Sequence, residues 1–163
     1  MDKVTKDQTV VIRSHGVGLD VYEKLAKVGA EVIDATCPFV ARIHKIAAEK
    51  SGEGYVILIA GDEAHPEIMG IRGHCSGESY VFSSCDDFEN LVKEKDFSSK
   101  KVAILAQTTY NKNMWRKCEE LFERYLPEAV VYNTICSATS ERQKEAAELA
   151  KAADIMIIVG GLH

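Results

Sequence analysis

The run at residues 55–60, Tyr-Val-Ile-Leu-Ile-Ala, is apolar at every position. A strand with one face in water alternates apolar and polar residues, whereas a strand covered on both faces, as in parallel sheets, is apolar throughout. Parallel neighbours need a crossover connection, which is usually a helix. The run therefore predicts an α/β fold with a covered parallel sheet.

Predicted strands and helices alternate along the whole chain. Short apolar or β-branched runs predict strands at residues 10–13, 32–36, 55–60, 80–82, 101–106, 130–135 and 155–159. Helical spacing of apolar residues predicts helices at residues 19–28, 38–50, 66–74, 86–92, 112–125 and 138–152. This series of roughly six or seven βα steps predicts small α/β units with parallel sheets and right-handed crossovers.

Composition argues against several classes of protein. The chain has 163 residues, of which 46% are apolar, and this suffices for one or two layered domains with buried cores. The net charge is −5 with both signs interspersed, which argues against a nucleic-acid partner. No apolar run approaches the roughly 20 residues that span a bilayer, so no membrane partner is expected.

Cysteine usage and the first residues predict a cytoplasmic location. Residues 1–6 do not have the pattern of a signal peptide. The 5 cysteines are odd in number, widely spaced and without a CxxC pair, which argues for a reducing compartment. Any metal site would have to be assembled from distant segments of the chain.

Two of the cysteines stand at equivalent junctions between a predicted strand and a predicted helix. Cys37 ends one apolar run and precedes Pro38, a residue well tolerated at the first position of a helix. Cys136 ends another run and precedes a capped helix start. Free N–H groups and partial positive charge at a helix N-terminus stabilise a thiolate. We therefore expect the two thiols to share one site.

Other polar residues also follow predicted strands, where ligands bind in open α/β sheets. The full set is His15, Cys37, His65, Glu67, Gln107, Thr108, Thr109, Cys136, Thr139, Gly160 and Gly161. Each has a structural interpretation as well, since histidines and threonines cap turns and helices and paired glycines form turns. For Cys75, Cys85 and Cys118 the interpretation as small buried hydrophobes is preferred.

The joint occurrence of these groups leaves two kinds of site open. Thiolates select zinc, copper(I) or iron–sulfur clusters, and two thiolates with two imidazoles fit a zinc site. Hydroxyls and an acid nearby fit a small anionic substrate and proton transfer, with Glu67 placed rigidly by Pro66. The alternative to a redox enzyme is a non-redox α/β module that binds zinc or a phosphate ester.

Five motifs occur in an order that matches a known family. They are Arg-Ser-His-Gly-Val at 13–17, Asp-Ala-Thr-Cys-Pro at 34–38, Ala-His-Pro-Glu at 64–67, Gln-Thr-Thr at 107–109 and Cys-Ser-Ala-Thr-Ser-Glu-Arg-Gln at 136–143. Over essentially its whole length, the chain resembles the 4-hydroxy-3-methylbut-2-enyl diphosphate reductase (IspH/LytB) family, which acts last in the non-mevalonate isoprenoid pathway. The resemblance implies a three-lobed iron–sulfur reductase that yields isopentenyl and dimethylallyl diphosphate.

The resemblance also implies roles for individual residues. Cys37 and Cys136 match two of the three cysteines that hold a 4Fe–4S cluster in this family. His15 and His65 match diphosphate-binding histidines, Glu67 the acid of the proton relay and Thr108 the threonine near the substrate hydroxyl. Gln107 and Thr139 are neighbouring candidates for substrate binding. A ferredoxin or flavodoxin is the implied electron donor.

Three family features have no match in residues 1–163. These are the first cluster cysteine, in a segment rich in glycine and phenylalanine, a further histidine that precedes the matched region, and the Ser-x-Asn diphosphate loop that follows the glycines near Gly160 and Gly161. The resemblance therefore implies a central piece: the end of a first lobe at 1–37, a complete second lobe at 38–133 and the start of a third at 134–163. The third cysteine ligand is expected outside this chain, and the isolated chain is expected to be inactive.

Overall fold

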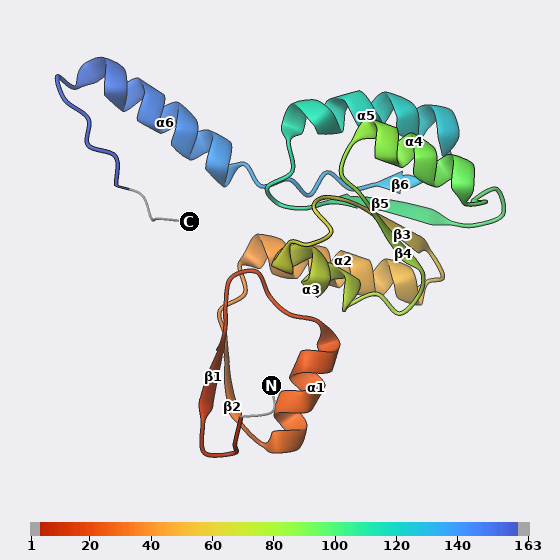
Figure 1. Cartoon of the computed structure of the whole chain (residues 1–163), viewed down its shortest axis with the longest axis horizontal. Coiled ribbons are helices and arrows are strands. Elements are labelled where there is room, and N and C mark those ends of the chain that lie inside the picture. The colour runs from red at the N-terminus through yellow and green to blue at the C-terminus, as the bar shows by residue number, and fades with distance from the viewer. Residues whose placement is uncertain (1–3, 160–163) are drawn as a thin grey trace.

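The computed structural model describes residues 4–159, without the side chains of residues 139 and 140. The strands are β1 (Thr9–Ile12), β2 (Glu31–Asp34), β3 (Val56–Ala60), β4 (Ser79–Phe82), β5 (Val102–Ala106) and β6 (Val130–Val131). The helices are α1 (Leu19–Val28), α2 (Pro38–Gly52), α3 (Pro66–Arg72), α4 (Cys85–Glu94), α5 (Lys112–Tyr125) and α6 (Ala138–Ala152). Strands and helices alternate in two parallel sheets, so the predicted α/β class is confirmed (Figure 1).

The larger sheet has the strand order β4-β3-β5-β6, and helices cover both of its faces (Figure 1). Because side chains alternate along a strand, Val56 and Leu58 of β3 pack towards α4 and α5. Ile57 and Ile59 of the same strand pack towards α2 and α3. This explains why β3 carries no polar residue: both of its faces lie in a core.

The smaller sheet pairs β1 with β2 in parallel, and α1 connects the two strands. The helix α1 ends at Gly29, whose φ of 74° is left-handed and accessible to glycine without strain. Ile12 and Leu25 are buried, but Val11 and Ile33 are 61% and 51% exposed. Within the described chain, this sheet therefore has apolar surface that no helix covers.

The prediction of a last strand at residues 155–159 is wrong. This segment is irregular, and Ile157 and Val159 are 85% and 91% exposed. A strand forms only beside a neighbour that pairs with its backbone, and residues 4–159 offer this segment none. The predicted glycine pair Gly160 and Gly161 lies outside the described residues.

The strand expected at residues 130–135 is shorter than predicted. Only Val130 and Val131 pair with β5, and the chain then runs irregularly to α6, which extends away from the sheets (Figure 1). Buried Thr134 holds this connection to the sheet, because its hydroxyl lies 2.9 Å from the Ala106 nitrogen and 2.5 Å from the Ala106 oxygen. None of the helices between residues 4 and 159 has the length and apolarity to cross a membrane.

Leu58→Ala should lower the free energy of unfolding by about 2–5 kcal/mol, the usual cost of a cavity at a buried leucine. Leu58 has no exposed surface, whereas Leu149 on α6 is 57% exposed. Leu149→Ala, the matched control, should change it by about 0.5 kcal/mol or less. Urea unfolding of both variants measures the difference, and equal costs would contradict the three-layer packing.

Candidate functional site

The carboxyl ends of β3 and β5 lie side by side, because Ala60 pairs with Ala106. Gly61 and Gln107 leave the sheet together, and the buried amide oxygen of Gln107 accepts a bond of 3.1 Å from the Asp62 N–H. A Cβ at Gly61 would lie 2.8 Å from that oxygen, so a larger residue here would displace the Gln107 side chain. Gln107 thus braces the two strand ends against each other.

Glu67 reaches from α3 to the residue that follows Gln107. One carboxylate oxygen accepts from the Thr108 N–H at 2.6 Å, and the other accepts from the Thr108 hydroxyl at 2.7 Å. Glu67 is 2% exposed and lies in the first turn of α3, where the helix dipole favours a negative charge. The two bonds satisfy a carboxylate that would otherwise be costly to bury.

Two histidines meet beside this pair. His65 is the N-cap of α3, and its Nδ1 accepts from the Glu67 N–H at 3.1 Å, so Nε2 carries the proton of the neutral ring. Its ring lies edge-on to that of His15, with 5.3 Å between centroids. His15 Nδ1 is buried with no protein partner among residues 4–159. Both imidazoles therefore retain hydrogen-bonding capacity for a ligand.

The two predicted site cysteines are held by backbone bonds to this group of residues. The Cys37 N–H donates to the carbonyl of Ser14, the residue before His15, at 3.0 Å. The Cys136 N–H donates to the Thr108 carbonyl at 2.8 Å, and its sulfur lies 3.4 Å from the Ala138 nitrogen. Both thiols are free and half-buried. Cys37 is therefore held next to the His15–His65 contact, and Cys136 is held next to the Glu67–Thr108 pair.

The described residues do not assemble a complete metal site. Among residues 4–159, no three histidine, cysteine or acidic side chains lie where they could hold one ion. The side chain of Thr139 lies outside the described part of the chain. The structure thus brings together His15, His65, Glu67 and Thr108, and among residues 4–159 it places neither Cys37 nor Cys136 in a cluster of three candidate ligands.

The other three cysteines lie in or against the core. Cys118 is buried with the aromatic side chains of α4 and α5, and Cys85 packs beside it. Burial raises the pKa of Cys118 to about 12 and that of Cys75 to about 11. Cys118 and Cys75 therefore remain protonated at neutral pH and behave as small apolar groups.

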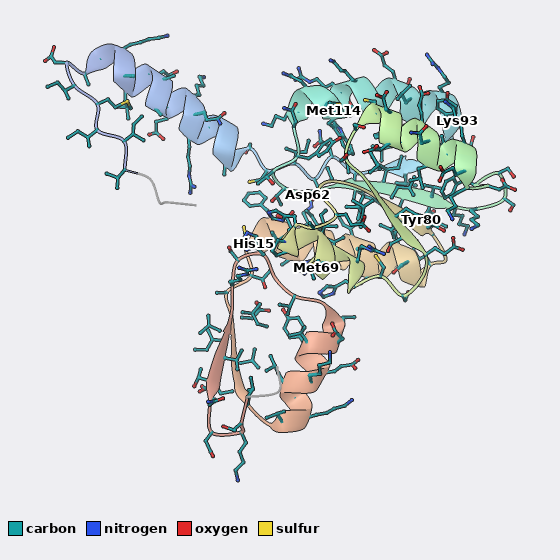
Figure 2. The ribbon with its side chains drawn as sticks, viewed as in Figure 1. His15, Asp62, Met69, Tyr80, Lys93 and Met114 are labelled. Carbon is teal, nitrogen blue, oxygen red and sulfur yellow. The ribbon has the colours of Figure 1, made fainter. Side chains whose placement is uncertain are left out.

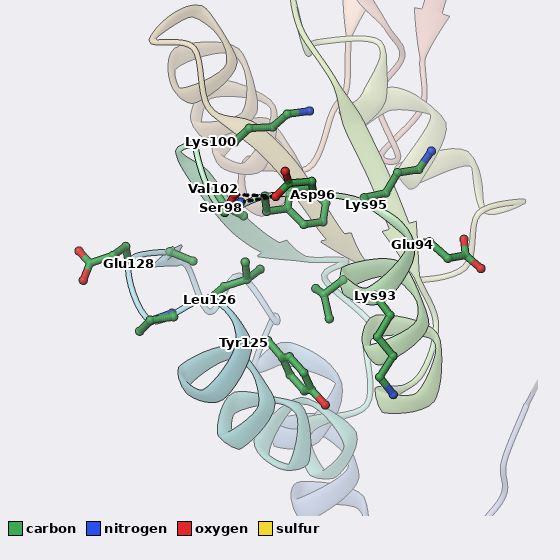
Figure 3. Close-up of a pocket in the computed structure, with 14 residues that line it drawn as sticks. Lys93, Glu94, Lys95, Asp96, Ser98, Lys100, Val102, Tyr125, Leu126 and Glu128 are labelled. Carbon is green, nitrogen blue, oxygen red and sulfur yellow. Dashed lines mark hydrogen bonds between the residues drawn. The ribbon is translucent and has the colours of Figure 1, made fainter.

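An open pocket of about 560 Å³ lies at the carboxyl ends of the strands, and Asp62, His65, Gln107 and Thr109 are among its lining residues. A second pocket, of about 610 Å³, lies at the opposite end, beside the first residue of β5 (Figure 3). Lys93 and Lys100 in this second pocket already pair with Glu89 and Glu78. Of these two pockets, the one at the carboxyl ends of the strands thus carries the groups suited to chemistry.

Sequence reasoning missed a stacked pair of histidines, one buried and one half-buried, at the joint between the two sheets. His44 is 5% exposed, and its ring stacks on that of His74 with 4.2 Å between centroids. Burial, and then the neighbouring His74, lower the pKa of His44 to about 4, so it is neutral at physiological pH. The one available signal was spacing, since position 44 lies two helical turns after Cys37.

The fold and the site define an α/β protein that gathers imidazoles, thiols and a buried acid where its parallel strands end. The comparison with family models specifies the family: the chain belongs to the LytB protein family, whose model matches residues 1–163. The resemblance inferred from the five motifs is therefore confirmed.

Curated relatives carry the name 4-hydroxy-3-methylbut-2-enyl diphosphate reductase. The protein of Thermoanaerobacter sp. (strain X514) is 40% identical over 163 residues, which cover 100% of this chain and 55% of the relative. The protein of Clostridioides difficile (strain 630) is 38% identical, with 100% and 57% covered. The chain thus spans little more than half the length of these relatives.

Solved structures show the same likeness. A structure of (E)-4-hydroxy-3-methyl-but-2-enyl diphosphate reductase, the terminal enzyme of the non-mevalonate pathway, matches with a TM-score of 0.81 and 37% identity. That match covers 98% of this chain and 56% of the other. The reductase from Plasmodium falciparum matches with a TM-score of 0.80 and 25% identity, over 98% and 50% of the two chains.

Alkylation should separate the site thiols from the core thiols. At about pH 8, iodoacetamide should modify Cys37 and Cys136 faster than Cys75 or Cys118, because the thiolate is the reactive form and burial suppresses it in the latter two. Peptide mass spectrometry measures each rate, and labelling in guanidinium provides the unfolded reference. Equal rates at Cys118 and Cys37 in the folded chain would contradict this assignment.

Proposed function

We propose that this chain forms part of an enzyme that reductively removes the hydroxyl of (E)-4-hydroxy-3-methylbut-2-enyl diphosphate, giving isopentenyl and dimethylallyl diphosphate. The observation that carries the proposal is the buried contact of Glu67 with Thr108 beside the His15–His65 pair. Membership of the LytB family and the names of its relatives support it. The reaction consumes two electrons and two protons, and it releases the oxygen as water.

Cys37 and Cys136 would hold two irons of a 4Fe–4S cluster. Free, half-buried thiols, each fixed by its own backbone N–H, fit this donor role, and thiolates select such clusters. Since residues 4–159 contain no complete metal site, the third cysteine would come from outside this chain. When bound, the cluster would pass electrons to the substrate and polarise its hydroxyl group.

His15 and His65 would bind the diphosphate. His65 Nε2 carries a proton that it can donate, and His15 has a buried nitrogen without a protein partner. A protonated ring nitrogen donates strongly to phosphate oxygens. Gln107 and Thr139 are proposed as further substrate contacts, with Gln107 also bracing the strand ends.

Glu67 and Thr108 would deliver protons to the departing hydroxyl. The Thr108 hydroxyl lies 2.7 Å from the Glu67 carboxyl group, so Glu67, once protonated, can donate to that hydroxyl while Thr108 passes its own proton to the departing hydroxyl. The Thr108 N–H bond at 2.6 Å keeps the carboxylate in place during the transfer. Burial of both residues excludes water that would compete for this proton.

The remaining parts of the proposal concern the whole enzyme. A ferredoxin or flavodoxin would supply the electrons in the cytoplasm. The lobes would divide at residues 1–37, 38–133 and 134–163, which is supported by the packing of α2 on the larger sheet rather than on β1 and β2. The non-redox zinc or phosphate-ester module is disfavoured, since the named relatives are reductases.

A chimera tests whether this chain supports a redox cluster. Residues 1–163 replace the matching segment of the Thermoanaerobacter reductase, which is 40% identical. After anaerobic reconstitution, the chimera should be brown and contain iron and sulfide in equal amounts. Cys37→Ser should abolish loading, whereas Cys75→Ser, the matched control, should preserve it. A colourless chimera that binds zinc instead would favour the non-redox module.

Glu67→Gln in the loaded chimera should lower kcat by about 10²-fold or more, because it keeps the shape but removes the titratable proton. Glu63→Gln is the matched control, since Glu63 is exposed and pairs with Arg72 on the surface. That control should leave the kcat unchanged. A kcat of Glu67→Gln within a few-fold of the parent would remove Glu67 from the proton relay.

A further inference from the structure

The loop between β1 and α1 brings His15 to the larger unit. Figure 2 shows His15 at the end of the β1–β2 unit that faces the helices of the larger sheet. The two units have separate sheets, so the strand pairing that aligns β3 with β5 does not extend to this loop. Contacts other than sheet pairing must therefore hold the His15 ring with its centroid 5.3 Å from that of the His65 ring.

The side chain of His44, on α2, fills the space between this loop and α3. A Cβ at Gly16 would lie 2.4 Å from His44 Cε1, and one at Gly70 would lie 3.1 Å from His44 Nε2. The same Cβ at Gly70 would lie 3.5 Å from the carbonyl oxygen of His15. The imidazole thus contacts two glycine backbones at once, and one of them belongs to the residue after His15.

The loop is also bonded to the C-terminal end of α3. His74, which stacks on His44, donates from Nε2 to the Val17 carbonyl at 3.0 Å. The Leu19 N–H donates to the Gly73 carbonyl at 3.2 Å. Gly18 and Gly73 pack backbone to backbone, since a Cβ at Gly73 would lie 2.5 Å from the Gly18 Cα. These contacts join the loop to the helix whose N-cap is His65.

One ring nitrogen of His44 lowers the stability of the fold at this joint. Its Nε2 is buried without a hydrogen-bond partner among residues 4–159, and a buried polar atom of this kind is destabilising. An apolar side chain would fill the space without that cost, so filling space does not by itself explain a histidine. The flat ring does provide a narrow wedge that also stacks on His74.

We propose that His44 is a positioning residue for diphosphate binding, which wedges the β1–α1 loop against α3 and so sets His15 against His65. This inference rests on the proposed function, in which His15 and His65 hold the diphosphate. His44 does not touch the substrate in this scheme. It acts through the backbone of Gly16, whose φ of 67° and lack of a side chain admit the ring.

The test uses the 163-residue chain with inorganic pyrophosphate as the probe. In the unmodified chain, NMR should show a cross-peak between the His15 and His65 rings, and both should shift on titration. His44→Ala should lose the cross-peak and bind pyrophosphate roughly tenfold to a hundredfold more weakly, the effect expected from one misplaced donor to a charged group. His44→Gln, which keeps volume but not the stack, should behave in the same way and replaces His44→Ala if that variant does not fold.

Ile46→Ala is the matched control, because it removes a partly buried side chain of the same helix that packs into the core of the larger unit. It should lower stability while keeping the cross-peak and the pyrophosphate affinity. A His44 variant with both readouts intact would overturn the positioning role. If the unmodified chain shows the cross-peak but neither ring responds to pyrophosphate, the proposed function fails. In that case the cross-peak in His44→Ala still tests the positioning role: its loss supports the role, and its persistence contradicts it.

Discussion

The arrangement of the site depends above all on the pairing of β3 with β5. Both strands are buried at every residue, so their backbone groups find partners only in the sheet, and five rungs from Val56 with Val102 to Ala60 with Ala106 fix the register. Both chains then leave the sheet at the same edge. The turn after β3 leads to His65 and Glu67, and the turn after β5 leads to Gln107 and Thr108, so a single register brings these groups together.

Burial of Glu67 completes this arrangement. A carboxylate with 2% exposure needs partners, and it takes both from Thr108, 41 positions along the chain. The bonds connect α3 to the end of β5 and place a buried carboxyl group beside two imidazoles. The hydrogen bonds of the Glu67 carboxyl group therefore lie across the site rather than within α3.

The two units of the chain differ in how completely each buries its own apolar residues. The larger sheet has a core on each face, whereas β1 and β2 leave Val11 and Ile33 exposed and rest on the larger unit through the loop that carries His15. Ile155, Ile157, Ile158 and Val159 are likewise at least 82% exposed. Apolar sequence alone does not form a strand, because the backbone hydrogen bonds of a strand need a second strand. The relative position of the two units thus depends on side-chain packing and glycine contacts rather than on sheet pairing.

The sequence by itself determined the alternation of strands and helices, the covered parallel sheet and the positions of His15, Cys37, His65, Glu67, Thr108 and Cys136 at strand ends. These follow from local physics: hydrophobic period, proline and glycine at helix ends, and the shared edge to which parallel strands lead. Only the tertiary structure decided that Glu67 bonds to Thr108, that His44 lies between Gly16 and Gly70, and that residues 155–159 are not a strand. Each of these depends on which distant segment comes within a few ångströms, and that distance is set by packing between elements rather than by the residues that flank each position.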